Sequence, residues 1–215
     1  MIERPSKIVC VGMNYTEHVR EFGGILPTEP VLFMKAASSW SACDVPLIMP
    51  AGAEKLDYEV ELGVVIGREA KNVSRDEAKN YISGFTVVCD YSERAWQKER
   101  GGQWMKGKSH DGFCPAGPRV VPAEEIGNVQ NLRLWSRVNG KTRQDGTTAD
   151  MIFPVDFLIS YISQFMTLWP GDVVATGTPS GVGMGMEPPQ FLKVGDVVEL
   201  GIEGIGEFRQ EIVSA

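Results

Sequence analysis

The sequence predicts an α+β fold, a single β-rich domain over residues 1–215 in which antiparallel strands dominate. Three observations lead to this prediction. Short apolar runs of roughly four to eight residues recur along the chain, as expected for strands. Glycine is frequent, at 24 of 215 residues, and most of it separates these runs. Only one long segment, Asp150–Leu168, carries apolar residues at helical spacing.

The first half of the chain is expected to alternate strands with short helices. The expected strands are Lys7–Gly12, Val31–Lys35, Asp57–Gly67 and Phe85–Asp90. The expected helices are Asn14–Phe22, Ser74–Ser83 and Tyr91–Glu99. Ser74 and Glu77 have the spacing of a capping box, which places a helix start at Ser74. Segments 36–55 and 101–118 are rich in Ser, Ala, Pro or Gly and are expected to be irregular.

The second half contains the clearest local signals. Asn139-Gly140 lies between two strand-like runs, 132–138 and 141–144, and Asn-Gly is a strong hairpin signal. In Asp150–Leu168, Asp150 can cap a helix and Pro154 is tolerated in the opening turns. The remaining expected strands are Val173–Gly177, Val197–Glu203 and Glu207–Val213, the last two paired across a glycine-containing turn.

Composition restricts the class of protein and its location. The formal net charge of −7 argues against nucleic acids and anionic membranes as partners, because both require basic patches. The four cysteines form no CxxC pair, which argues against structural zinc and a redox pair. No apolar run is long enough to span a bilayer, and the N-terminus does not resemble a signal peptide. We therefore expect a cytoplasmic protein with reduced cysteines.

The segment Asp57–Gly67 carries the first indication of chemistry. Side chains alternate along a strand, so Asp57, Glu59 and Glu61 would share one face while Tyr58 and its apolar neighbours point into a core. Carboxylates at this spacing lie roughly 6–7 Å apart and repel each other. Such a cluster persists either because water solvates it or because a divalent cation neutralises it. The segment alone leaves both explanations open.

Further residues could complete a metal site. Asp90 ends an apolar strand candidate, Lys108 lies in a glycine-containing turn, and His18 and Glu21 would share one face of a helix. Oxygen ligands without cysteine or paired histidines favour Mg²⁺, Mn²⁺ or Ca²⁺ over zinc. Each residue also has an ordinary structural explanation, as a turn cap, a solvated lysine or a surface pair. Residue types and spacing therefore support only a weak metal-site hypothesis.

A series of motifs nevertheless occurs in order along most of the chain. They are Val11-Gly12 with Asn14–His18, Pro30–Lys35, Tyr58–Leu62, Asp90–Arg94, Trp104 with Gly107–Pro115, Gln144–Met151 and Gly171–Gly183. In this combination the chain resembles the fumarylacetoacetate hydrolase family. The resemblance implies a β-rich roll of mixed, mainly antiparallel sheets, one Mg²⁺ or Mn²⁺ per subunit, and a homodimer.

The resemblance also implies roles for individual residues. The implied metal ligands are Glu59, Glu61 and Asp90, and the implied substrate-binding residues are Arg94, Gln97 and Thr178. Lys108 matches the family's active-site lysine, and His18 with Glu21 matches a catalytic dyad on a lid near residues 13–28. Asp57 matches no ligand position and is expected to be solvated or paired.

Two features depart from the family pattern. His110 stands where an aromatic residue, usually Phe, is common, and the lid segment Gly23–Thr28 has no basic residue that could hold a distal carboxylate. Both differences are expected to affect the choice of substrate rather than the core reaction.

The implied activity is metal-dependent hydrolysis of the C–C bond of a 2,4-dioxo acid, an acylpyruvate or fumarylpyruvate-like compound, with release of pyruvate. Three alternatives use the same site: an oxaloacetate decarboxylase, a 2-hydroxyhepta-2,4-diene-1,7-dioate-type isomerase, and a hydrolase of diketo sugar acids. A fold alone does not choose among such activities. A non-enzymatic module that binds an oxo acid is less expected, because the carboxylates, the lysine and the dyad are all present.

Overall fold

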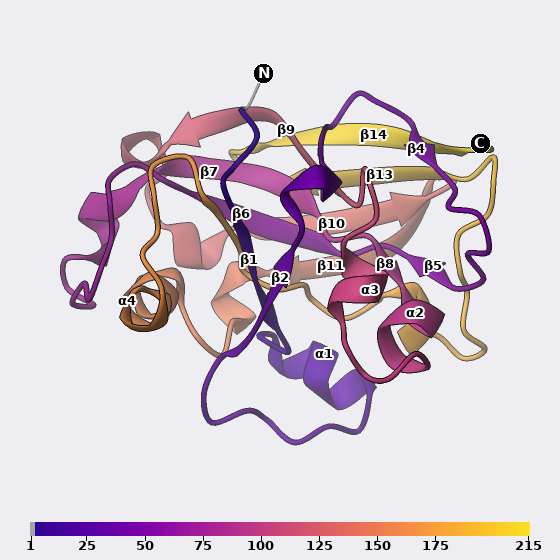
Figure 1. Cartoon of the computed structure of the whole chain (residues 1–215), viewed down its shortest axis with the longest axis horizontal. Coiled ribbons are helices and arrows are strands. Elements are labelled where there is room, and N and C mark those ends of the chain that lie inside the picture. Colours follow the sequence, from indigo (N-terminus) through magenta and orange to yellow (C-terminus); the bar gives the residue numbers. More distant parts are fainter. Residues whose placement is uncertain (1–2) are drawn as a thin grey trace.

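Two large β-sheets, a two-stranded pair and a few short helices make up the computed structural model, which describes residues 3–215 (Figure 1). The larger sheet has the order β2-β1-β12-β6-β7-β9-β3. Its strands are β1 (Ile8–Gly12), β2 (Val31–Lys35), β3 (Trp40–Ala42), β6 (Val60–Ile66), β7 (Ile82–Cys89), β9 (Cys114–Pro122) and β12 (Val173–Ala175). Antiparallel pairs predominate, although β1 pairs with β12 and β3 with β9 in parallel. The predicted α+β fold with mixed, mainly antiparallel sheets is confirmed.

The smaller sheet has five strands in the order β11-β10-β13-β14-β4. They are β4 (Leu47–Ile48), β10 (Arg133–Val138), β11 (Lys141–Thr147), β13 (Val197–Ile202) and β14 (Gly206–Val213). Both hairpins expected from local signals are present, β10–β11 across Asn139-Gly140 and β13–β14 across the turn at 203–205. A separate two-stranded pair joins β5 (Leu56–Asp57) to β8 (Ser92–Glu93).

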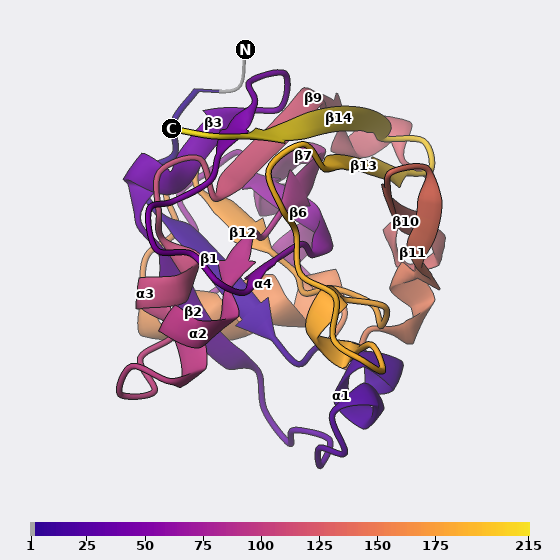
Figure 2. The ribbon, with the colours of Figure 1, turned by 90° about the vertical axis from the view of Figure 1, so that its right-hand side faces the viewer.

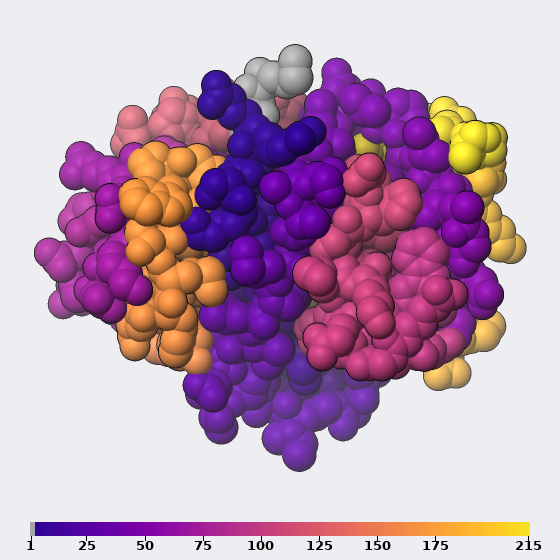
Figure 3. Space-filling view, viewed as in Figure 1, coloured from indigo at the N-terminus to yellow at the C-terminus, as the bar shows by residue number. Residues whose placement is uncertain are grey.

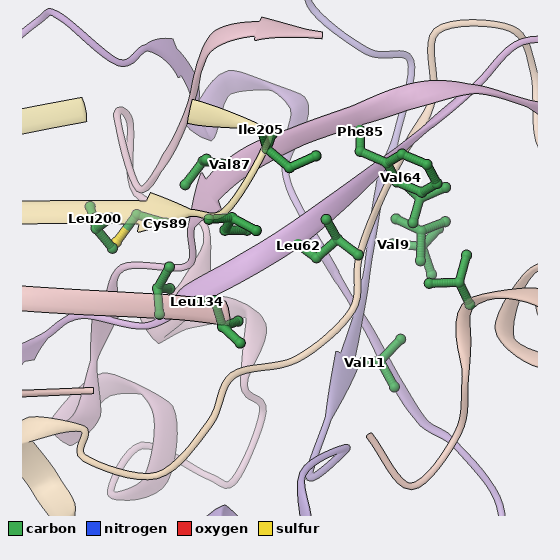
Figure 4. Packing of buried hydrophobic residues seen from close by; sticks show 14 of the residues in the cluster. Val9, Val11, Leu62, Val64, Phe85, Val87, Cys89, Leu134, Leu200 and Ile205 are labelled. Atoms are coloured by element: carbon green, nitrogen blue, oxygen red, sulfur yellow. The ribbon is translucent and has the colours of Figure 1, made fainter. Parts of the chain in front are cut away.

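The main core combines side chains from both sheets. Leu62 and Val64 point from β6 into this core, as the alternation along the strand predicts. Val60 belongs to the same cluster. Leu134 and Leu200 reach the same cluster from the smaller sheet (Figure 4). Each fully buried side chain of this size contributes about 1.5–3 kcal/mol to folding. The opposite face of β6 is therefore free to carry Glu61.

Among the described residues, four short α-helices lie at the margins of the sheets. They are α1 (Thr16–Glu21), α2 (Arg94–Lys98), α3 (Met105–Lys108) and α4 (Val155–Phe165). Figure 2 shows α1 at one end of the molecule, beside the loop that follows β12. Within residues 3–215 no helix is long and apolar enough to cross a membrane.

Several expected elements differ from the structure. The helix expected at Ser74–Ser83 is reduced to a 3₁₀ turn at Ala78–Tyr81, because the Ser74 hydroxyl binds the Glu77 carboxylate instead of capping a helix. The segment 36–55 contains β3 and β4, and the segment 101–118 contains α3 and most of β9. Both segments pair with strands that are distant in sequence, which composition does not reveal.

The long helix also begins later than expected. Residues Thr148–Asp150 form a 3₁₀ turn, and α4 starts at Val155 after Pro154. Tertiary contacts keep the residues before α4 out of the helix, because Asn14 forms hydrogen bonds with the backbone of Ile152 and Phe153. At the other end, Leu168 leaves the helix to pair with Ala70.

Candidate active site

Three buried carboxylates meet where β6 begins and β7 ends. Val60 pairs with Cys89 across these antiparallel strands, and the Asp90 N–H donates to the Glu59 carbonyl at 2.9 Å. Glu59 and Asp90 are thereby neighbours, and Glu61 lies two residues further along β6. One oxygen from each carboxylate lies within 4.8 Å of the other two. All three side chains are buried, so the solvated-face explanation is wrong for them.

Buried cations contact two of these carboxylates. Lys108 Nζ, at the end of α3, donates to Glu59 Oε2 at 2.5 Å and to Asp90 Oδ2 at 2.7 Å. Lys35 Nζ pairs with the other oxygen of Asp90. Arg94 Nη2, from α2, donates to Glu59 Oε1 at 2.7 Å. Glu59 and Asp90 are thus each held by two cations.

Glu61 is different, because no cation of residues 3–215 bonds to it. It accepts only the Gly177 N–H, at 2.9 Å. Burial, and then the charges of Asp90 and Glu59, raise the pKa of Glu61 well above its ordinary value. With all four buried carboxylates ionised, Asp57, Glu59, Glu61 and Asp90, the cluster has one negative charge more than its three buried cations, Lys35, Arg94 and Lys108, compensate. This excess, and an all-oxygen donor set, fits a hard divalent cation.

The charge state of Lys108 follows from the same contacts. Burial disfavours its ammonium form, but the charges of Asp90 and Glu59 outweigh burial and raise its pKa. Burial likewise acts against the charge of Glu59, yet Arg94 and Lys108 lower its pKa. These contacts therefore favour the ammonium form of Lys108.

Asp57 is fully buried and paired, one of the two outcomes that the sequence left open. The strand expected at Asp57–Gly67 is broken: Asp57 belongs to β5, and β6 starts only at Val60. Asp57 accepts the Arg94 Nε–H at 2.9 Å and the Gly183 and Met184 N–H groups at 2.7 and 3.1 Å. Asp57 therefore links Arg94, which also bonds to Glu59, to the loop after β12.

The predicted lid contacts the same loop after β12 through α1. His18 Nδ1 lies 3.2 Å from Glu21 Oε2 on α1, and Glu21 Oε1 accepts the Gly181 N–H at 2.9 Å. A Cβ at Gly185 would lie 2.2 Å from the Glu21 Cδ atom, so a larger residue there would displace the Glu21 side chain. In the space-filling view the lid segment forms the lower edge of the molecule, next to the region of α2 and α3 (Figure 3).

One cavity of about 150 Å³ unites the predicted residues. Its wall contains every predicted site residue except Asp90, which lies behind Lys108, and Glu21, which supports His18 from the lid. Apolar side chains form much of the remaining wall, among them Phe33 and Trp104, whose ring centroids are 5.4 Å apart. The tertiary structure therefore brings together residues that span 160 positions, from His18 to Thr178.

Gln144 is a structural part of the site that sequence reasoning did not single out. Its amide nitrogen donates to Thr178 Oγ1 at 2.7 Å, and its Oε1 accepts the Val60 N–H at 3.0 Å. Thr178 Oγ1 in turn donates to the Val60 carbonyl at 2.8 Å. Gln144 thus fixes the start of β6, between Glu59 and Glu61. Sequence reasoning also missed Lys35. Gln144 and Lys35 each lie at the end of an expected strand, which is the same signal that pointed to Asp90.

His110, expected to affect substrate choice, lies outside the cavity wall. Its ring centroid is 5.3 Å from that of Phe113 and 6.1 Å from that of Trp96. The lid segment Gly23–Thr28 also contributes no residue to the wall.

Comparisons with known proteins agree with the arrangement. Residues 7–213 match the family described as Fumarylacetoacetate (FAA) hydrolase C-terminal. The chain is 50% identical over 207 residues to a 2,4-didehydro-3-deoxy-L-rhamnonate hydrolase of Sphingomonas sp. (strain SKA58), covering 96% of this chain and 73% of that protein.

Two solved structures show the same fold. A fumarylacetoacetate hydrolase from psychrophilic Exiguobacterium antarcticum is 38% identical, with a TM-score of 0.92 over 99% of this chain and 76% of that one. A 2-hydroxyhepta-2,4-diene-1,7-dioate isomerase from Mycobacterium marinum is 39% identical, with a TM-score of 0.86 over 98% of this chain and 75% of that one.

Proposed function

This chain belongs to the fumarylacetoacetate hydrolase family, and from that membership we propose that it is a Mg²⁺- or Mn²⁺-dependent hydrolase that cleaves the C–C bond of a 2,4-dioxo acid and releases pyruvate. The observation that carries the proposal is the buried triad of Glu59, Glu61 and Asp90, of which Glu59 and Glu61 line one cavity together with Lys108 and His18.

The donor set suits the proposed metal. Three carboxylates with no cysteine or histidine favour a hard cation, and Glu61 has no cationic partner among residues 3–215. Bound by Glu59, Glu61 and Asp90, Mg²⁺ or Mn²⁺ would supply Lewis acidity to the oxygens of the oxo acid.

In the proposed reaction His18 acts as the base. Its Nδ1 faces Glu21, which leaves Nε2 as the ring atom that can accept a proton from water. The water oxygen bonds to C4 of the substrate, and the C3–C4 bond breaks with its electron pair passing to the pyruvate enolate. Protonation of C3 by His18 then completes pyruvate, while C4 becomes the carboxyl carbon of the second product.

Lys108 stabilises the charge that develops in this step. Its ammonium group is held in place by Glu59 and Asp90 before the reaction begins. A preorganised donor of this kind stabilises a developing enolate without reorganisation of solvent. Arg94 has a supporting role, because its three nitrogens are engaged by Asp57, Glu59 and Gln97.

A second candidate function is isomerisation of a 2-hydroxydienoate, favoured by the similarity to the Mycobacterium marinum isomerase. Oxaloacetate decarboxylation and cleavage of a diketo sugar acid also pass through an enolate, and the 50% identical Sphingomonas protein is named for the latter type of substrate. These reactions differ in whether His18 must activate a water. The implied homodimer stays a prediction.

A substrate panel with two variants tests the proposal. The protein is assayed on acylpyruvates, diketo sugar acids, a 2-hydroxydienoate and oxaloacetate with Mg²⁺ or Mn²⁺. We expect acylpyruvate hydrolysis to be lost on chelation and to fall about 10²–10⁴-fold in His18→Ala, whereas oxaloacetate decarboxylation changes little. Glu17→Ala, an exposed change on the same helix, is the control. Full activity of the metal-free protein, or equal losses of both reactions in His18→Ala, would contradict the proposal.

A further inference from the structure

Arg143, on β11, is a half-buried guanidinium that forms no ion pair with any carboxylate of residues 3–215. Among the arginines of that range, only Arg94 and Arg143 are not exposed. Arg94 is neutralised by two buried carboxylates, Asp57 and Glu59. A guanidinium stays charged in proteins, and a charge withdrawn from water normally has a partner. Arg143 therefore differs from Arg94 in lacking a counter-charge from the described part of the chain.

The hydrogen bonds of Arg143 are also incomplete. Its Nη1 donates to Met186 Sδ at 3.2 Å, and a thioether is a weak acceptor. Its Nε is buried and has no acceptor within residues 3–215. Unsatisfied donors in partly buried positions lower stability, so a ligand with strong acceptor oxygens would bind favourably to this guanidinium.

Arg143 lines a second cavity, which we call the Arg143 pocket and which has a volume of about 440 Å³. This pocket shares no lining residue with the cavity of the candidate active site. The loop after β12 contributes to both, with Met184 in the active-site cavity and Pro189 and Phe191 in the Arg143 pocket. β11 packs closely against this loop (Figure 2), because a Cβ at Gly181 would lie 2.0 Å from the Arg143 carbonyl oxygen. The Arg143 pocket is therefore a separate feature of the fold.

The charges in the wall of the Arg143 pocket favour a ligand with a single negative charge. Lys193 adds a second cation, while Glu54 and Asp196 add two carboxylates, so the wall has no net charge. A dianion would be repelled by both carboxylates without an excess of cations to offset them. Much of the remaining wall is apolar or aromatic: Tyr58, Val138, Phe191 and Leu192. A carboxylate group on an apolar body matches this combination.

We propose that the Arg143 pocket is a second ligand site, in which the guanidinium of Arg143 binds the carboxylate of a small, largely apolar organic acid. The inference goes beyond the proposed function and does not depend on it, since the site contains no residue of the carboxylate triad or the lid dyad. It also gives a role to a residue that directly precedes the motif Gln144–Met151 and received none from the sequence.

Methionine-methyl NMR with benzoate as the probe tests the site. The protein carries [methyl-¹³C]methionine and is kept in Mg²⁺, which is diamagnetic. Benzoate should shift the Met186 signal and saturate it with a Kd of about 1–10 mM, whereas the signal of Met13, in the wall of the active-site cavity, should stay in place. Benzamide has nearly the same shape and no charge, so it should bind about tenfold more weakly or not at all. Sulfate, a dianion without an apolar body, should also bind more weakly than benzoate.

Matched variants assign the binding to Arg143. Arg143→Leu should abolish the benzoate-dependent shift of Met186, and Arg143→Lys should weaken binding, because an ammonium group keeps the charge but not the planar pair of donors. Arg137→Leu removes an exposed arginine that stacks on Trp135 on the neighbouring strand, and it should leave the affinity unchanged. An unchanged Met13 signal in each variant shows that the protein is folded.

Three results would overturn the site: equal affinity for benzoate and benzamide, a shift of Met13 without a shift of Met186, or unchanged binding in Arg143→Leu. Tighter binding of sulfate than of benzoate would overturn the assigned ligand class. Because none of these measurements requires turnover, failure of the proposed hydrolysis would leave the site intact, and failure of the site would leave the proposed hydrolysis intact.

Discussion

Replacing Glu61 with Gln is expected to have opposite effects on the metal-free and the metal-loaded protein. Glutamine is nearly isosteric and keeps an oxygen that can accept the Gly177 N–H. Without metal, the change removes a buried negative charge that no cation of residues 3–215 bonds to, so the free energy of unfolding should rise. With metal, the change removes a proposed ligand, so stabilisation by the metal should be lost.

The magnitude follows from the spacing of the carboxylates. Oxygens of Glu59 and Asp90 lie within 4.8 Å of the Glu61 oxygen. At an effective dielectric constant of about 20, two unit charges at that distance repel by about 3.5 kcal/mol. Lys108 and the Gly177 N–H offset part of the two repulsions, which leaves a stabilisation of about 2–4 kcal/mol for metal-free Glu61→Gln. Metal at a hundredfold excess over its Kd would stabilise the wild type by about 2.7 kcal/mol.

The effect should depend on pH with a definite sign. Burial, Asp90 and Glu59 raise the pKa of Glu61 in the folded state above the ordinary value of about 4.3. The stabilisation gained from binding this proton is present at pH values below the unfolded pKa, and it is lost as pH rises through the folded pKa. The advantage of metal-free Glu61→Gln over the wild type should therefore be small near pH 4 and grow as the pH increases.

Urea unfolding followed by tryptophan fluorescence, with EDTA or with excess Mn²⁺, measures both effects. Glu69→Gln, which changes an exposed carboxylate, is the matched control and should leave both curves unchanged. The reasoning is refuted if metal-free Glu61→Gln is less stable than the wild type at pH 8. It is also refuted if Mn²⁺ stabilises the variant as much as the wild type.

Two further substitutions test the support of the site. Arg94→Met leaves two buried carboxylates without this partner and should lower the free energy of unfolding by about 3–5 kcal/mol in urea titrations. The control Arg75→Met breaks an exposed ion pair and should lower it by less than about 1 kcal/mol. Equal losses in the two variants would contradict a special structural role for the buried arginine. Gly185→Ala should displace Glu21 and lower acylpyruvate hydrolysis about tenfold or more while leaving Mn²⁺ affinity unchanged. Gly127→Ala has open space around it and should change neither quantity, so a similar loss there would exclude the docking explanation.

Local patterns in the sequence predicted the elements whose contacts are themselves local. The hairpin at Asn139-Gly140 and the alternation along β6 are visible in the structure because neighbouring residues determine both. The helix predicted from the capping box at Ser74 is wrong, since the side chains of Ser74 and Glu77 bind each other and only a 3₁₀ turn follows. The predicted start of the long helix at Asp150 is also wrong, because Asn14, far away in the chain, holds the residues before α4 in another conformation.

The same division holds for the site. Residue types, order and family resemblance identified the three carboxylates, Lys108 and the lid dyad as candidates. They could not separate Asp57 from Glu59 and Glu61, because strand alternation places all three on one face. In the structure the strand breaks after Asp57, which Arg94 and two backbone N–H groups then engage.

By itself, the sequence determined the chemical groups that this protein can use and the periodic elements that carry them. Only the tertiary structure decided which groups are neighbours: Asp90 lies beside Glu59, and Glu61 has no cationic partner in residues 3–215. The physical reason is that the behaviour of a buried charge depends on the charges within a few ångströms of it. Those charges come from strands and helices that are far apart in the chain.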